Sequence, residues 1–266
     1  MISKKRVVLQ ISNIIALVIT IIMNFLSGIG LINNKAVGEV SDDYPNLFTP
    51  AGFTFSIWSI IYLFLILYVI YQAKDLFKTE KENMPFNEQI SVFFVLSCVF
   101  NSIWIVIWVY ELILLSLIII ILLLLDLIII YLRLNIARKE VDSKVKILVW
   151  IPFSLYLGWI TIATIANTTV FLVSINWDGF GISPFIWVVI ILVIALILTL
   201  TVLFTRKDMI YPLVTIWALF GITAARLGQS LELAIFAVIL ALIIAATLIG
   251  FIIWRKFIVM NKNSLS

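Results

Sequence analysis

Long runs of apolar residues, separated by short polar and charged segments, dominate this chain of 266 residues. A transmembrane helix needs about 20 mainly apolar residues, because each residue rises about 1.5 Å and the hydrocarbon core is about 30 Å thick. Helices satisfy their own backbone hydrogen bonds in lipid, and runs of this length favour them over barrel strands. We therefore predict eight membrane-spanning helices, at roughly residues 7–29, 51–73, 88–110, 112–134, 147–174, 184–204, 209–226 and 231–254.

The polar residues that interrupt these runs differ along the chain. Up to Ser174 the predicted spans carry scattered polar and aromatic residues, but the fourth span is apolar on every side, which predicts that it faces lipid. A loop, "INWDGFGISP", then precedes the last three spans. We therefore predict an all-α polytopic membrane helix bundle. It would have a five-helix membrane domain at residues 1–175 and an additional three-helix membrane segment with a short cytoplasmic tail at residues 176–266.

Composition and charge place this bundle in a membrane and orient it. Apolar residues make up 64% of the chain and charged residues only 12%, too much apolar surface for a soluble domain to bury. If the N-terminus is cytoplasmic, all the lysines and arginines lie in cytoplasmic segments except Lys35 and Arg226. The positive-inside rule therefore predicts a multi-pass protein of the cell membrane with both termini in the cytoplasm. The net charge of +4 then reports orientation, and we expect no nucleic-acid partner.

Several kinds of site chemistry are excluded by the residues that the chain lacks. There is no histidine, and Cys98 is the only cysteine. Intrachain disulfides, zinc sites, Ser-His-Asp triads and a histidine haem ligand are therefore excluded. We expect no catalytic residue, no metal and no cofactor, and we interpret Cys98 as a small buried apolar residue.

Indole and amide groups recur at helical spacing within three of the predicted spans, where residues three or four apart share one face. They are Trp58 in the second span, Asn101, Trp104 and Trp108 in the third, and Trp159 and Asn167 in the fifth, where the small Ala163 lies between them on the same face. Trp58, Asn101 and Asn167 lie at similar depth, about 10–13 Å below the outer ends of their helices. Such groups either hold helices together or line a ligand pocket. Their matched depth and face favour a pocket beneath the long external loop at residues 31–50.

Three stretches of these spans resemble a known family. "PAGFTFSIWSIIY" at 50–62, "NSIWIVIW" at 101–108 and "LYLGWITIATIAN" at 155–167 resemble signature stretches of the tryptophan-rich sensory protein family. That family includes the mitochondrial translocator protein, also called the peripheral benzodiazepine receptor. The three stretches occur in the family's order, one in each expected helix, and the resemblance covers about residues 7–174.

The resemblance implies a five-helix bundle whose internal cavity is capped by the first loop and binds porphyrins or other hydrophobic molecules. The chain departs from the family at Leu155, where the family has a proline. Carried over by position, the expected ligand-binding residues are Trp58, Tyr62, Asn101, Trp104, Trp108, Trp159, Ala163 and Asn167. The expected partners are the lipid bilayer and a porphyrin-like or lipid-like small molecule. Whether the chain forms a homodimer stays open.

Charged residues within or beside the spans raise a further alternative. Asp126 lies deep in the fourth span, where inserting a carboxylate would cost about 2.5–3.5 kcal/mol. It is either a proton-coupling group or a neutral or hydrogen-bonded acid toward the cytoplasmic side, seven residues from Arg133. Arg226 and Glu232, near the outer ends of adjoining spans, are predicted to be interfacial, and an ion pair there would be weak.

Three functions are consistent with these observations. The leading one is a membrane receptor or sensor that binds a hydrophobic ligand, such as a tetrapyrrole or a sterol, and assists its transport. The second is a proton-coupled secondary transporter. Asp126 favours this function, but the sequence shows neither an internal repeat nor the paired broken helices that are typical of such transporters. The third is an enzyme acting on a tetrapyrrole or lipid, which lacks nucleophile–base pairs and metal ligands.

Overall fold

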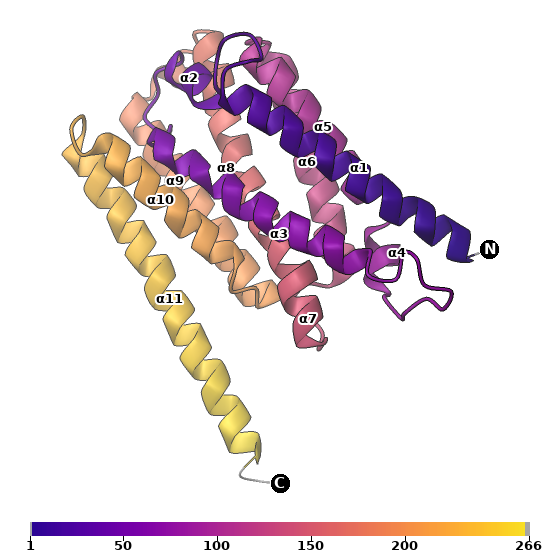
Figure 1. Ribbon diagram of the computed structural model, residues 1–266. Helices are drawn as coiled ribbons and strands as arrows, with labels where there is room; N and C mark the ends of the chain where they lie inside the picture. Colours follow the sequence, from indigo (N-terminus) through magenta and orange to yellow (C-terminus); the bar gives the residue numbers. More distant parts are fainter. Residues whose placement is uncertain (1, 264–266) are drawn as a thin grey trace.

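The computed structural model describes residues 2–263, and in that part of the chain the regular structure is entirely helical (Figure 1). The long helices are α1 (Ile2–Gly28), α3 (Ile57–Gln72), α5 (Phe93–Val109), α6 (Ile113–Leu134), α8 (Ile151–Ser174), α9 (Pro184–Thr201), α10 (Tyr211–Arg226) and α11 (Leu231–Asn263). Short helical segments are α2 (Val37–Asp42), η1 (Gly52–Ser56), α4 (Phe86–Ile90), α7 (Ser143–Val145), η2 (Lys146–Trp150), η3 (Gly179–Gly181) and η4 (Val202–Arg206).

Each predicted span contains one of the long helices, and the predicted all-α membrane bundle is confirmed. Within residues 2–263, six helical segments are long and apolar enough to cross a membrane, and α5 is a shorter apolar helix. The predicted third span does not begin as one continuous helix at residue 88. Ser91 has φ +52°, outside the right-handed helical region, and separates α4 from α5.

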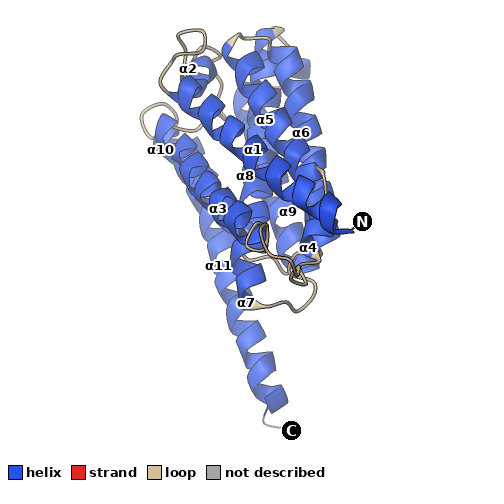
Figure 2. Ribbon diagram, turned by 45° about the vertical axis from the view of Figure 1, so that its right-hand side comes forward, coloured by secondary structure: helices blue, strands red, loops and turns tan. Residues whose placement is uncertain are grey.

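Successive long helices alternate in direction, so that the loops collect at two ends of the bundle (Figure 2). We call the end that contains α2 the α2 end. There Asn33 donates to the carbonyl of Val109, and Arg226 contacts the carbonyl of Thr49. The first turn of α1 and the last described turn of α11 both lie away from the α2 end (Figure 1). This placement follows from the even number of long helices in the described part of the chain.

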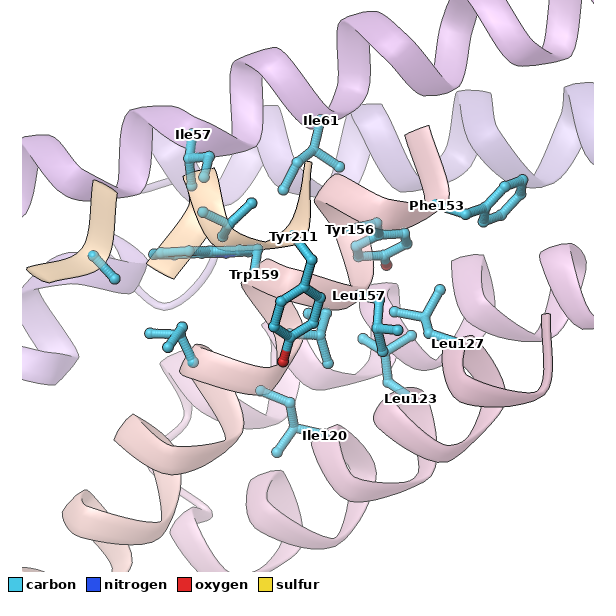
Figure 3. Close-up of a cluster of buried hydrophobic side chains, with 14 of the residues drawn as sticks. Ile57, Ile61, Ile120, Leu123, Leu127, Phe153, Tyr156, Leu157, Trp159 and Tyr211 are labelled. Atoms are coloured by element: carbon cyan, nitrogen blue, oxygen red, sulfur yellow. The ribbon is translucent and has the colours of Figure 1, made fainter. Parts of the chain in front are cut away.

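The last three long helices share a core with the first five. Tyr211 of α10 lies among residues of α3, α6 and α8 (Figure 3), and one continuous cluster of buried apolar side chains extends from α1 to α11. Two glycines permit close approach. A Cβ atom on Gly158 would lie 3.1 Å from Val214 of α10, and one on Gly221 would overlap the side chain of Thr54. The division into two domains near residue 175 stays a prediction.

Helix α6 corrects one expectation from the sequence. It was predicted to face lipid because it is apolar all round, but one face is buried against α5 and α8. Ile120 and Leu123 are fully buried, whereas Leu114 and Leu125 are 57% and 51% exposed. Leucine and isoleucine suit both a packed interface and lipid tails, so that an apolar sequence alone does not reveal which face packs.

Candidate functional site

Most of the predicted ligand-binding residues surround one small cavity at the α2 end, which we call the aromatic cavity. Its lining includes Trp58, Trp104, Trp108, Trp159, Ala163 and Asn167 from the predicted set. Helix α2 and the segment that follows it close the cavity with Val37, Ser41, Pro50 and Phe55. The cavity volume is about 30 Å³, space for about one water molecule. Helices α3, α5 and α8 therefore place the predicted side chains together, in a closed arrangement.

The aromatic rings of this cavity contact one another at right angles or in parallel. Trp58 stacks on Tyr62 with ring centroids 5.4 Å apart, and its indole meets Trp159 edge to face at 6.2 Å. Trp104 and Trp108, four residues apart on α5, stack at 5.5 Å. These are the arrangements that aromatic quadrupoles favour. The rings thus form two groups, one around Trp58 and one on α5, in which both edges and faces contact neighbouring rings.

The two predicted asparagines also join helices. Asn167 of α8 accepts a hydrogen bond from the Trp104 indole at 2.9 Å and donates to Ser116 of α6 at 3.1 Å. Asn101 is fully buried and accepts from the Tyr62 hydroxyl and from Asn24 of α1, at 3.2 and 2.9 Å. It does not line the aromatic cavity. Helix packing and pocket formation, which the sequence presented as alternatives, therefore coincide in Asn167, whereas Asn101 serves helix packing alone.

One polar group in the wall of the aromatic cavity lacks a partner. Trp159 is 2% exposed, and its indole N–H has no hydrogen-bond partner among the described residues. The carboxamide nitrogen of Asn101, which lies outside this wall, is also without one. A buried donor without an acceptor costs about 1–3 kcal/mol, and such groups are rare in folded proteins. Trp159 is therefore the group in this wall that an acceptor atom of a ligand would satisfy.

The loop at residues 31–50, which contains α2, lies over the aromatic cavity as a lid. The Trp108 indole donates to the carbonyl of Val37 at 2.9 Å. The ammonium of Lys35 bridges Asp43 and Glu111, with N–O distances of 2.6 and 2.5 Å. Hydrogen bonds to Asp43 and to Glu111 raise the pKa of Lys35. An ionic clamp at the solvent edge therefore connects the lid to the turn between α5 and α6.

The hydroxyl of Tyr44 joins this clamp. It donates to Glu111 at 3.2 Å, and burial followed by this hydrogen bond raises the pKa of Tyr44 above its ordinary value. Glu111 itself adopts a positive φ of 56° in the tight turn between α5 and α6. The lid is thus fixed at both its beginning and its middle to one turn.

A larger cleft adjoins the aromatic cavity on the side of α1 and α3. This side cleft has a volume of about 620 Å³, and its walls include Trp58, Tyr62 and Trp104 of the predicted set. Val37, Phe55, Trp58 and Trp104 line both the side cleft and the aromatic cavity and so separate the two. Phe25, on the α1 wall, is 63% exposed on the outside of the bundle. The walls of the side cleft therefore include the outer flank of α1 as well as the polar residues Glu39 and Asp42 of α2.

Several residues of this region were not predicted as ligand-binding residues. Asn24 holds Asn101, Ser116 holds Asn167, and Phe55 lies edge to face with Trp159 at a centroid distance of 6.0 Å. Asn24 and Ser116 were visible as isolated polar residues within apolar runs. Their partners were not visible, because the spans that they connect are far apart in the sequence.

Asp126 lies on the buried face of α6, away from the aromatic cavity. Its side chain is 5% exposed, and one carboxyl oxygen has no partner among the described residues. Arg133 donates instead to the backbone carbonyls of Gln89 and Glu88. Asp126 is therefore an isolated buried acid without the nearby arginine as a partner.

The family assignment agrees with this arrangement. A family model described as TSPO-like protein matches residues 10–253, which include the three helices beyond the five-helix region as well as the three signature stretches. No curated protein and no solved structure matches the chain. The match covers most of the sequence, and the eight-helix fold and its tryptophan-lined cavity lie within it. The chain belongs to the family of TSPO-like proteins.

Proposed function

We propose that this protein is a membrane receptor or sensor that binds a flat hydrophobic molecule, porphyrin-like or sterol-like, in the aromatic cavity and assists its transfer. The observation that supports this most is the convergence of four indoles from α3, α5 and α8, together with the unpartnered N–H of Trp159. A conjugated ring stacked on these indoles gains about 0.5–1.5 kcal/mol per aromatic pair beyond the burial of its area. An oxygen or nitrogen acceptor on the ligand would then satisfy Trp159.

Binding requires the aromatic cavity to open. Small-molecule sites usually measure about 300–1,000 Å³, far above the 30 Å³ of the closed cavity. The side cleft of about 620 Å³ lies directly behind Phe55 and Trp58. Displacement of these two side chains joins the two spaces and gives a hydrophobic molecule access from the membrane between α1 and α3. Ligand binding then favours the open form because only that form has room for the ligand.

This opening also suggests how a bound ligand is sensed. Val37 and Ser41 of α2 belong to the wall of the aromatic cavity, so that a ligand there displaces the lid as well as the indoles. We propose that the α2 end faces away from the cytoplasm, since Lys35 and Arg226 are the two cations assigned to that side by the sequence. The lid would then report occupancy on the outer surface of the cell membrane.

Tryptophan fluorescence titrated with protoporphyrin tests this function. Purified protein in a neutral detergent should show saturable quenching, weakened in Trp58→Ala, because Trp58 belongs to both spaces. Trp254→Ala is the matched control, since Trp254 is 54% exposed on α11 and far from the aromatic cavity. Quenching that does not saturate, or that Trp58→Ala leaves unchanged, would show that the porphyrin only partitions into the detergent.

The isolated carboxyl of Asp126 favours a second candidate, a proton-coupled transporter. A buried acid without a charged partner binds and releases a proton as its surroundings change, which is the property that coupling requires. Protein in liposomes would then take up a hydrophobic solute faster when a proton gradient is imposed, and Asp126→Asn would abolish the gradient dependence. Uptake that ignores the gradient in the unchanged protein rules out this candidate.

A further inference from the structure

A second cavity at the α2 end lies between the two parts of the chain. It is enclosed by the ends of α8, α9 and α10 and by the first loop, and its volume is about 730 Å³. Its walls are mainly apolar and include Leu47, Leu172, Val173, Trp187, Val188 and Ile191. Apart from Ser41, which faces both, it shares no lining residue with the aromatic cavity. We call it the arginine cavity, because Arg226 is the cation in its wall.

Arg226 is buried without an anionic partner. Its side chain, at the end of α10, is 8% exposed and forms no ion pair among the described residues. One terminal nitrogen contacts the Thr49 carbonyl at 3.4 Å, the outer limit of a hydrogen bond, and Nε has no partner. Taking a guanidinium out of water costs several kcal/mol unless a charge or hydrogen bonds compensate. The fold therefore holds a positive charge beside an apolar space.

The acids near Arg226 do not neutralise it. Asp42 and Asp178 line the arginine cavity but are exposed, and Asp178 accepts a hydrogen bond from the backbone of Phe180. Glu232 is exposed and forms no ion pair with Arg226, although the sequence placed both at the interface. The first loop folds over the end of α10 and covers Arg226, so that this cation is buried by protein, and its interfacial depth stays a prediction.

The rim of the arginine cavity carries the aromatic residues typical of a membrane surface. Trp177 and Trp187 lie with ring centroids 5.0 Å apart, and the Trp187 indole donates to the carbonyl of Gly179 at 2.8 Å. Tryptophans of this kind collect at the level of the lipid head groups. Arg226 thus lies where an acidic head group meets its apolar chain.

We propose that the arginine cavity binds an amphiphile with an acidic head group, whose carboxylate or phosphate pairs with Arg226 and whose apolar chain lies along α8 and α9. A planar guanidinium binds both oxygens of such a group at once, and the buried setting strengthens the contact. The volume suits part of a lipid chain, since ligand sites of about 300–1,000 Å³ are usual. The head group has two sources, an anionic membrane lipid or a free fatty acid, which share this chemistry.

Native mass spectrometry of the full chain in a neutral detergent tests the proposal. Phosphatidylglycerol, oleate and phosphatidylcholine are added separately, and bound molecules are counted against concentration. We expect saturable binding of one phosphatidylglycerol or one oleate, with weaker binding of phosphatidylcholine. Arg226→Gln should lower the affinity for the acidic ligand about ten- to hundredfold, as expected for the loss of a charge-assisted hydrogen-bonded pair. Binding of phosphatidylglycerol alone identifies a membrane lipid, and binding of oleate alone identifies a free acid.

Two further variants keep the test decisive. Arg255→Gln makes the same charge change on an exposed part of α11, and it should bind the acidic ligand like the unchanged protein. Leu172→Trp narrows the arginine cavity without altering Arg226 and should also weaken binding, so that the proposal does not depend on the Arg226 variant alone. Equal binding by Arg226→Gln and the unchanged protein, or no preference for an acidic head group, overturns the proposal. The experiment contains no porphyrin, so its failure leaves the function of the aromatic cavity untouched.

Discussion

The two cavities at the α2 end differ in size, wall and charge. The aromatic cavity is nearly filled by indoles from three helices and carries no charged residue in its wall. The arginine cavity is about 730 Å³ and contains a buried cation at its edge. The first is assembled from residues that repeat along helix faces, whereas the second forms where the first loop meets the ends of α8, α9 and α10. Two neighbouring cavities of one bundle can therefore suit different ligands. The aromatic cavity suits a flat uncharged ring, and the arginine cavity suits an acidic amphiphile.

The largest expected effect comes from the contact between Gly221 of α10 and Thr54 of η1, which joins the last three long helices to the first five. A Cβ atom on Gly221 would overlap the Thr54 side chain, and Gly221 also accepts a backbone hydrogen bond from Ala51 at 3.0 Å. Gly221→Ala should lower the free energy of unfolding by about 1–3 kcal/mol through overpacking. The measurement is thermal unfolding in detergent. The matched control is Gly250→Ala, since no atom lies within 4 Å of a Cβ built on Gly250.

A second substitution tests the physical cause of that loss. If the overlap with Thr54 is responsible, adding Thr54→Ala to Gly221→Ala should recover most of the lost stability, because the two residues are in direct contact and their effects couple. Stability losses in the two single variants that simply add in the double variant would contradict the overlap. The contact between Gly221 and Thr54 would then not be what holds α10 against the segment before α3.

Next in size is the effect of the central indole. Trp159→Ala should weaken protoporphyrin binding about 10- to 100-fold, because a large aromatic residue at the centre of a binding site contributes most of the contact energy. Trp159→Phe retains an aromatic ring but lacks the N–H, and it should lose only the part due to that donor. Fluorescence titration measures both. If Trp159→Phe binds protoporphyrin as tightly as the unchanged protein, the unpartnered N–H has no role in recognition.

How far the sequence predicts this architecture depends on whether a feature repeats along one helix. Trp104, Trp108 and Asn167 were predictable, because residues at helical spacing share a face whatever the neighbours are. The burial of Arg226 was not predictable, since it depends on Thr49, which is 177 residues away in the chain and carried by a loop. The buried face of α6 was hidden for another reason, because its isoleucines and leucines are equally suited to lipid.

The lid should show a smaller effect. Glu111→Gln removes the carboxylate that holds Lys35 and Tyr44, and exchange of the backbone amides at residues 33–44 should rise about two- to fivefold, as expected for an exposed ion pair. Hydrogen–deuterium exchange with mass spectrometry measures this. Lys78→Met removes one cation from a pairing with Glu82 outside the lid and serves as the control, with no change expected at the lid.

The pH dependence of the lid follows from the raised pKa of Lys35. A lysine whose pKa is raised in the folded state contributes stability below its unfolded pKa of about 10.4 and loses it as the pH rises through the higher folded value. Lys35 therefore keeps its charge from neutral pH to about pH 9. Over this range the rate of amide exchange in the lid, corrected for its intrinsic pH dependence, should stay constant. Added salt should raise it, since exposed charges are screened. Salt-independent exchange would show that the clamp does not hold the lid.

The smallest expected effect is the most informative about the two cavities. Arg226→Gln should change protoporphyrin affinity less than about twofold, and Trp58→Ala should change acidic-lipid affinity by as little, because neither residue lines the other cavity and residues without a common partner act nearly independently. Ser41 lines both cavities and is the place where coupling would arise. Affinity for each ligand is measured with and without a saturating amount of the other. Equal reciprocal shifts well above twofold would mean that α2 transmits occupancy between the cavities, since linkage requires both ligands to feel the same coupling.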